Sequence, residues 1–159
     1  MSNHHRLYSG SGLLILLAAF ICGAPVVGAA ELADIADGEH RSAENSARNA
    51  WRHPVETLEF FGLEKGQTVA AIWPAGGWYT EVIGPYLNDD GQYIAAHWDP
   101  DSEIKFISAG VAKYKAKLAE YPDLYGNTQV AVLMYPDKMD FVPDASVDMI
   151  LTFRNIHNW

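Results

Sequence analysis

The sequence predicts an α/β fold built on a parallel β-sheet, and two observations favour it. Short apolar stretches typical of buried strands alternate along the chain with longer stretches of helical character, which is the pattern of a parallel sheet with right-handed crossovers. The first apolar stretch also runs through a tight Gly76-Gly77 turn directly into a helix. Four strands are expected: Thr68 to Ile72, Gln92 to Trp98, Thr128 to Met134 and Val147 to Phe153.

The helices are expected between and before these strands. A polar, alanine-rich stretch from Glu31 to Asn49 predicts a helical arm over the core. His53-Pro54 marks a boundary, since the residue before proline avoids the helix and proline suits the first helical turn. A helix beginning near Asp99-Pro100 has apolar residues at helical spacing: Ile104, Ile107, Val111, Tyr114 and Leu118. Three lysines toward its C-terminal end are expected to face solvent: Lys113, Lys115 and Lys117.

Residues 1–30 have the features of a secretory signal peptide. A weakly basic start precedes the apolar run from Leu13 to Ile21, and small residues from Val27 to Ala30 form a cleavage site. The apolar run is shorter than the about 20 residues that a membrane span needs, so an uncleaved anchor is the weaker alternative. We therefore expect a periplasmic or secreted protein with no stable membrane span after cleavage, and a domain formed by residues 31–159.

Charge and cysteine content restrict the classes of partner. All 20 acidic residues but only 10 of the 11 basic ones follow Ala30, so the mature chain has a net charge near −10. Such a surface repels phosphate backbones, which argues against nucleic acid and favours a small-molecule substrate. The only cysteine, Cys22, lies in the signal segment, and the spacing of His40, His53 and His97 does not suit a metal, so no metal site is expected.

The glycine turn is the leading candidate for a ligand site. At the point where a strand ends and a helix begins, small residues let backbone N–H groups approach a ligand, and the helix terminus adds partial positive charge. Gly76 and Gly77 are the small residues here. The alternative is that they form a plain tight turn.

Several strings resemble a known family. WPAGGWYTE and FRNIHNW are the most specific of them, and the resemblance extends from about Asn45 to Trp159. The chain resembles the exported, class I methyltransferase-like family that uses S-adenosylmethionine. The resemblance implies a Rossmann-like sheet of order 3-2-1-4, with the remaining strands of such a domain missing. A C-terminally truncated member would leave a sheet edge exposed, so self-association through this edge is also expected.

The resemblance also implies roles for individual residues. Six residues are expected to bind the cofactor, with Asp99 holding its ribose: Trp73, Ala75, Gly76, Gly77, Tyr79 and Asp99. An alternative for Asp99 is that it caps the following helix. Asn155 and His157, in the loop after the fourth strand, are the expected catalytic residues, and His157 has the chemistry of a general base. The alternative is that this loop only caps the strand.

Two departures from the family pattern define two hypotheses. Ala71 stands where the family commonly has an acidic residue, and Ala75 stands where it commonly has a glycine. An alanine at the second position is expected to restrict the φ angles of the turn. The leading hypothesis is an S-adenosylmethionine-dependent methyltransferase whose methyl acceptor the sequence does not name. The second is a non-catalytic exported binding module for a small molecule or a protein, on a degenerate form of the fold.

Overall fold

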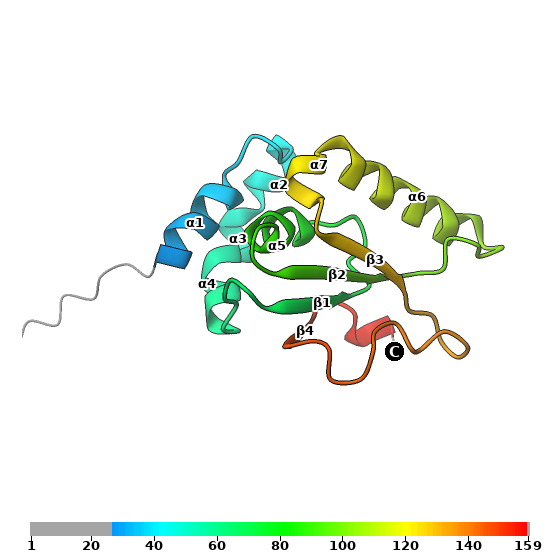
Figure 1. The fold of residues 1–159 in the computed structure, drawn as a ribbon. Coiled ribbons are helices and arrows are strands. Elements are labelled where there is room, and N and C mark those ends of the chain that lie inside the picture. The colour runs from blue at the N-terminus through cyan, green and yellow to red at the C-terminus, as the bar shows by residue number, and fades with distance from the viewer. Residues whose placement is uncertain (1–26, 159) are drawn as a thin grey trace, which may run out of the picture.

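The structure, a computed structural model, describes residues 27–158. The predicted signal peptide lies outside the described residues except for its last four, which begin the first helix. The elements follow in the order α1 (Val27–Ala36), α2 (Ala43–Ala47), α3 (Asn49–Arg52), α4 (Pro54–Phe60), β1 (Thr68–Ile72), α5 (Thr80–Leu87), β2 (Gln92–His97), α6 (Lys105–Glu120), α7 (Pro122–Tyr125), β3 (Thr128–Val132), β4 (Met149–Thr152) and η1 (Ile156–Asn158) (Figure 1). Within residues 27–158, no helix is both long and apolar enough to cross a bilayer.

The four strands form one parallel sheet in the order β3-β2-β1-β4, which confirms the predicted order. Ala71 in the central strand β1 pairs with Ala95 of β2 on one side and with Leu151 of β4 on the other. Three strands are shorter than predicted. Strand β2, for example, stops at His97 because the next backbone N–H, that of Trp98, donates to Nδ1 of the His97 ring instead of to a neighbouring strand.

The two faces of the sheet are covered differently. Alternate residues of β1 point to opposite faces, so Val69 and Ala71 join the main core while Ala70 joins a smaller cluster on the other side. The main core packs the sheet against the helices, with Leu58 of α4 and Ile83 of α5 fully buried. The smaller cluster is covered by the segment between β3 and β4, which contributes Phe141, Val142 and Val147.

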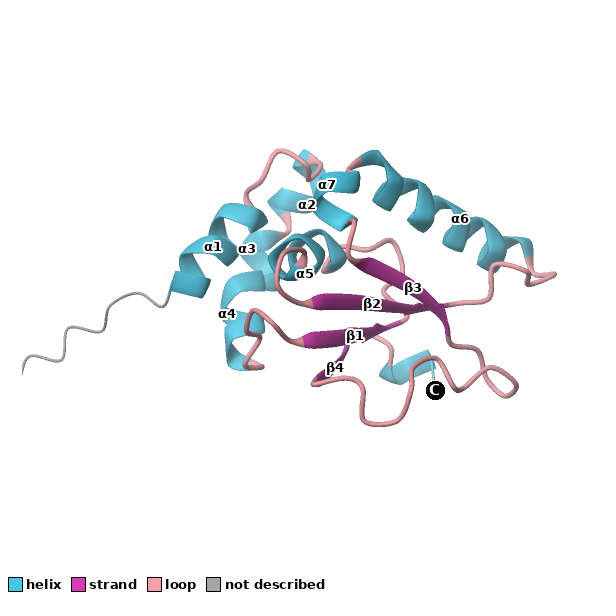
Figure 2. Cartoon of the chain, viewed as in Figure 1, coloured by secondary structure: helices cyan, strands magenta, loops and turns pink. Residues whose placement is uncertain are grey.

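Crossover handedness explains this asymmetry. The β1–α5–β2 and β2–α6–β3 connections advance in one direction across the sheet, so right-handed crossovers place α5 and α6 on the same face. The return from β3 to β4 must pass over the opposite face, and here residues 133–148 form a loop rather than a helix (Figure 2). The apolar face under this loop is therefore only thinly covered.

The predicted arm from Glu31 to Asn49 is helical and packs on the core, but it is not one continuous helix. Helix α1 ends at Ala36, and a turn leads into α2 and α3. Arg41, within that turn, is 5% exposed because its guanidinium pairs with a buried carboxylate, and this contact draws the turn inward. Helix α6 also begins later than predicted, at Lys105, so Ile104 precedes it and is 59% exposed.

The His53-Pro54 boundary is confirmed. His53 has φ +42° and directly follows α3, and Pro54 is the first residue of α4. Strand β4, at the edge of the sheet as described, pairs with β1, and its Ile150 is 53% exposed. Self-association through this edge stays a prediction.

Candidate functional site

The turn after β1 has an unusual backbone. Trp73, Ala75 and Gly77 all have positive φ, at +46°, +51° and +80°. A left-handed conformation suits glycine but costs other residues about 1 kcal/mol or more each. The expectation that Ala75 would restrict the turn is therefore corrected, since Ala75 adopts the left-handed conformation that glycine would take. The surrounding structure must hold two unfavourable residues in place.

His97 at the end of β2 supplies one such restraint. Its Nε2 lies 3.1 Å from the carbonyl oxygen of Ala75, while its Nδ1 accepts a hydrogen bond of 2.8 Å from the backbone N–H of Trp98. Because Nδ1 is an acceptor, the ring proton is on Nε2, and the Nε2–H group donates a hydrogen bond to the carbonyl oxygen of Ala75. Burial lowers the pKa of His97, so the neutral ring is the form that holds the turn.

A buried group of three hydroxyls lies next to the turn. The hydroxyl of Thr80 lies 3.0 Å from that of Tyr93 and 2.9 Å from that of Tyr114. Burial raises the pKa of Tyr93 to about 12, so both phenols stay neutral hydrogen-bonding groups. The ring of Tyr114 also explains Gly77, because a Cβ there would lie 2.9 Å from its Cε2.

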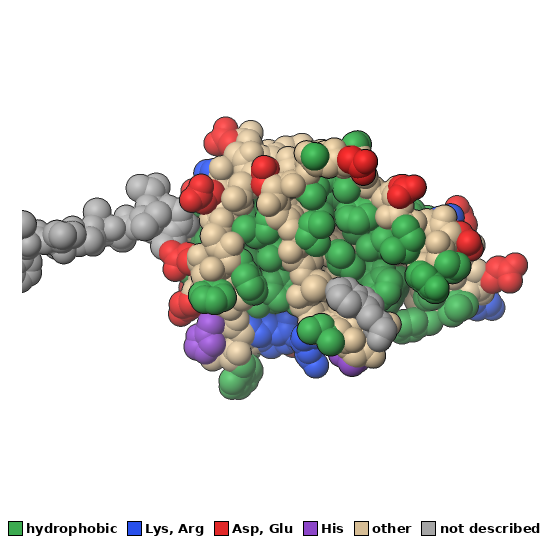
Figure 3. Space-filling view, turned by 90° about the horizontal axis from the view of Figure 1, so that it is seen from below, with side chains coloured by type: hydrophobic (Ala, Val, Ile, Leu, Met, Phe, Trp, Pro, Cys, Tyr) green, Lys and Arg blue, Asp and Glu red, His purple; other side chains and the backbone are tan. Residues whose placement is uncertain are grey.

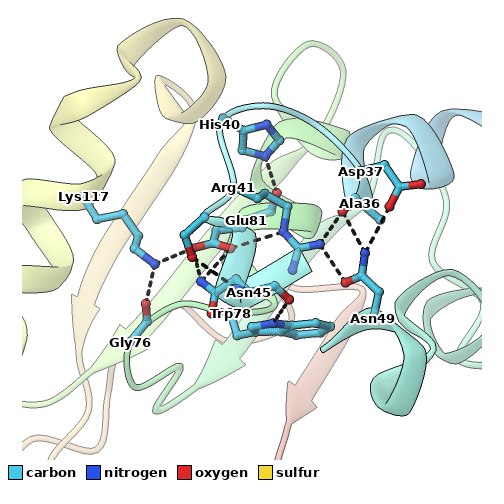
Figure 4. A network of polar contacts seen from close by, with 11 residues as sticks. Ala36, Asp37, His40, Arg41, Asn45, Asn49, Gly76, Trp78, Glu81 and Lys117 are labelled. Carbon is cyan, nitrogen blue, oxygen red and sulfur yellow. Dashed lines mark hydrogen bonds and ion pairs between the residues drawn. The ribbon is translucent and has the colours of Figure 1, made fainter. Parts of the chain in front are cut away.

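A second buried group joins the turn to the N-terminal arm through Glu81, in the first turn of α5 (Figure 4). The carboxylate of Glu81 is 3.2 Å from Nε of Arg41 and 2.5 Å from Nζ of Lys117, and it accepts hydrogen bonds from the amide of Asn45. Lys117 also donates to the carbonyl of Gly76 at 2.8 Å. The prediction that Lys117 faces solvent is wrong for this reason.

The arm is fixed further by Arg41 and Trp78. Arg41 donates from Nη1 to the carbonyl of Ala36 and to Oδ1 of Asn49, at 2.5 and 2.9 Å. The indole N–H of Trp78 donates to the carbonyl of Asn45 at 3.0 Å, and the Arg41 guanidinium lies 4.8 Å from the centre of the Trp78 ring. Helices α2 and α3 are thereby held beside the glycine turn.

A cavity of about 410 Å³ opens beside the turn, at the carboxyl end of β1. Such a volume suits a small-molecule ligand. Six of the eight residues predicted for the site line it: Trp73, Ala75, Gly76, Tyr79, Asn155 and His157. The strained residues Trp73, Ala75 and Arg154 (φ +61°) also line it, and strain of this kind is typical of functional sites.

Two predicted site residues lie outside the lining of this cavity. Gly77 is buried against Tyr114, so its role is in the backbone of the turn. Asp99 instead pairs with Lys138, with 2.6 Å between Oδ2 and Nζ, and the hydrogen bond to Lys138 lowers its pKa. Asp99 does not cap α6, because the cap position is Ile104. It accepts a hydrogen bond from the backbone of Asp101 at 3.0 Å.

The two predicted catalytic residues differ in their surroundings. Asn155 is 7% exposed, and its amide nitrogen donates to the carbonyl of Ile72 at 2.9 Å and lies 3.1 Å from the hydroxyl of Thr152. Its Oδ1 accepts from Asn158 at 3.2 Å. His157, in contrast, is exposed on η1 and lines the cavity.

The cavity wall contains residues that the sequence did not single out. These are Arg48, just before α3, and Arg52, at the end of α3. Trp98, directly after β2, also lines the cavity, and the sequence did offer it as a pocket-wall residue. Tyr79 stacks on Phe153, with 3.6 Å between ring centres. An apolar cavity of about 480 Å³ adjoins the first, and Trp73 lines both. In residues 27–158, no three His, Cys, Asp or Glu side chains are grouped to hold a metal ion.

Comparison with known proteins adds evidence on the fold. No family model and no curated protein matches the chain. A solved structure from Lactobacillus casei ATCC 334, a cyclopropane-fatty-acyl-phospholipid synthase-like protein, matches with a TM-score of 0.54 and 16% identity over 77% of this chain. The fold is Rossmann-like, with a parallel sheet of order 3-2-1-4.

A second solved structure, of a candidate O-methyltransferase from Klebsiella pneumoniae, matches over 72% of this chain with a TM-score of 0.38 and 14% identity. The chain spans a little under half of both solved chains, 46% of each.

Proposed function

We propose that this chain is the cofactor-binding part of an S-adenosylmethionine-dependent methyltransferase and that the cavity beside the turn holds the cofactor. The observation that carries the proposal is the left-handed backbone at Trp73, Ala75 and Gly77. The turn keeps the shape of a glycine-rich ligand turn although two of its three left-handed residues have side chains. A plain turn would have no reason to retain that unfavourable shape.

The residues of the cavity fit most of such a ligand. Gly76 is exposed to the cavity, and a Cβ there would meet nothing within 4 Å, so this part of the turn is open to a bound molecule. Ala71 is small and lies in the lining. The aromatic side chains of Trp73 and Trp98 offer flat surfaces for a purine ring.

S-adenosylmethionine supplies a methyl group already activated on sulfur, so the protein's part is mainly to position the acceptor. We assign His157 the role of general base, because an exposed imidazole in the cavity wall can accept a proton from the acceptor. Asn155 is better described as a positioning residue, since both ends of its amide bond to the protein and join the loop after β4 to the end of β1.

The non-catalytic binding module is the second candidate, and the cavity lining favours it in one respect. Ala71 replaces the expected carboxylate, and no Asp or Glu lines this cavity in the described part of the chain. The ammonium group of the cofactor would then lack an ionic partner. Export to the periplasm or beyond is also proposed, and the sequence of residues 1–30 supports it.

Equilibrium dialysis with labelled S-adenosylmethionine tests the proposal. The unmodified protein is expected to bind the ligand, and Gly76→Val is expected to abolish binding by filling the open side of the turn. Ala112→Val, on the exposed surface of α6, is the matched control and should bind normally. If neither the unmodified protein nor Ala112→Val binds S-adenosylmethionine, the non-catalytic binding module is favoured instead.

A further inference from the structure

The charge of the cavity opposes the charge of the chain. The sequence has a net charge of −9, yet three arginines line the cavity beside the turn: Arg48, Arg52 and Arg154. Figure 3 shows a group of Lys and Arg side chains gathered in one place beside hydrophobic ones, while acidic side chains lie around the margin of that face. The candidate site of this acidic protein is therefore lined by positively charged side chains.

The arginines come from two directions. Arg48 directly precedes the short helix α3, and Arg52 is its last residue. Arg154 follows β4 and has a left-handed backbone conformation. The guanidinium of Arg52 lies 4.5 Å from the centre of the Trp78 ring, and that of Arg48 lies 6.0 Å from it. Burial lowers the pKa of Arg52, and the nearby charges of Arg48 and Arg154 lower it further. Arg52 is therefore close enough to each of the other two cations to be repelled by it.

This repulsion is not balanced by carboxylates. Of the five ion pairs among residues 27–158, none includes Arg48, Arg52 or Arg154. Arg41 shows the contrast, since this buried arginine beside Trp78 is paired with Glu81. Guanidinium groups match carboxylates and phosphates in shape and charge, and a cluster without its own carboxylates is arranged to receive an anion.

The second cavity indicates what the rest of the ligand is like. It is lined mainly by apolar side chains, including Leu133, Tyr135 and Met139, and it shares Ile72, Trp73 and Asn158 with the first. A molecule with an anionic group at the arginines can therefore place an apolar or aromatic body in the second cavity.

We propose that Arg48, Arg52 and Arg154 bind the anionic group, a carboxylate or a phosphate, of a small apolar or aromatic methyl acceptor. The assignment of this ligand as the acceptor rests on the proposed function, whereas the anion site itself does not. A carboxylate and a phosphate can each accept two parallel hydrogen bonds from one guanidinium group.

Titration calorimetry with three matched probes tests the site: benzoate, phenyl phosphate and the neutral benzamide. At least one anion is expected to bind at least tenfold more tightly than benzamide, and the tighter of the two identifies the group preferred. Arg52→Gln and Arg154→Gln are each expected to weaken that binding about tenfold. Lys105→Gln, an equal loss of charge at an exposed position outside these cavities, is the control and should change it less than twofold.

The two arginine variants lie on different segments, so a folding defect in one leaves the other as a test. Equal binding of benzamide and both anions would overturn the anion site, as would unchanged binding by both arginine variants. Repeating the titration with saturating S-adenosylhomocysteine separates the two proposals. Retained anion binding is expected for an acceptor site. Competition would mean that the arginines hold the cofactor's own carboxylate and would overturn the acceptor assignment.

If S-adenosylhomocysteine does not bind while the anion does, the proposed function and the acceptor assignment fail and the anion site stands.

Discussion

The ring of His97 donates a hydrogen bond to the carbonyl of Ala75, so a buried side chain at the end of β2 restrains the turn that follows β1. The contact connects the carboxyl ends of the adjacent strands β1 and β2, where the cavity opens. Because Nδ1 of the same ring accepts from the backbone of Trp98, a second proton on the ring would break that hydrogen bond.

The first prediction follows from the lowered pKa of His97. In the unfolded chain the ring titrates near pH 6.5, whereas in the folded protein it stays neutral to lower pH. Below about pH 6.5 the unfolded state therefore binds a proton that the folded state does not, and the free energy of unfolding should fall as the pH decreases toward the folded pKa. Urea denaturation at a series of pH values measures this slope. His97→Gln should reduce it, and an identical slope in both proteins would contradict the role given to His97.

The second prediction separates the two glycines of the turn. Gly77→Ala should lower the free energy of unfolding by about 2–4 kcal/mol, because φ is +80° there and the added Cβ meets Tyr114. Gly76→Ala should change it by less than about 0.5 kcal/mol, since the site is open. Chemical denaturation compares the two variants, and equal losses would show that the turn is not arranged as described.

The third prediction concerns Glu81. Glu81→Gln leaves Arg41 buried without its counter-charge, so a loss of about 3–5 kcal/mol in the free energy of unfolding is expected. Glu59→Gln, on the exposed side of α4, removes the same charge without such a partner and should cost less than about 0.5 kcal/mol. The denaturation midpoints of the two variants measure this difference in stability. Similar stability of the two variants would mean that the arm does not depend on Glu81.

The fourth prediction compares two buried threonine hydroxyls. Thr80→Val removes a group bonded to both Tyr93 and Tyr114 and should cost about 1–3 kcal/mol. The hydroxyl of Thr128 is buried without a hydrogen-bond partner among the described residues, so Thr128→Val should be neutral or stabilising. Thermal melts of both variants measure the difference, and a larger loss for Thr128→Val would reverse the assignment.

The order of the strands could be predicted from the sequence because strand and helix patterns are local. The apolar run from Thr68 to Ile72 and the turn after it were sufficient to place the candidate site at the end of the central strand. The bounds of strands and helices were less predictable, since they depend on individual contacts such as that between Trp98 and the His97 ring.

The polar groups of the site could not be predicted in the same way. Arg41 and Glu81 are 40 residues apart, and the polar arm that contains Arg41 has the composition of a solvated helix. Arg48 and Arg52 were missed for the same reason. No local pattern distinguishes a solvated arginine from one that a long-range contact directs into a cavity. Asp99 had the right place along the chain for a ribose ligand, but its pairing with Lys138 depends on the loop after β3.

A crystal structure of the protein grown with S-adenosylhomocysteine would show where the ligand binds. We expect the ligand in the cavity beside the turn from Trp73 to Gly77, with its amino-acid part against the open backbone of Gly76. A cavity left empty at saturating ligand, or a ligand bound elsewhere on the protein, would contradict this expectation.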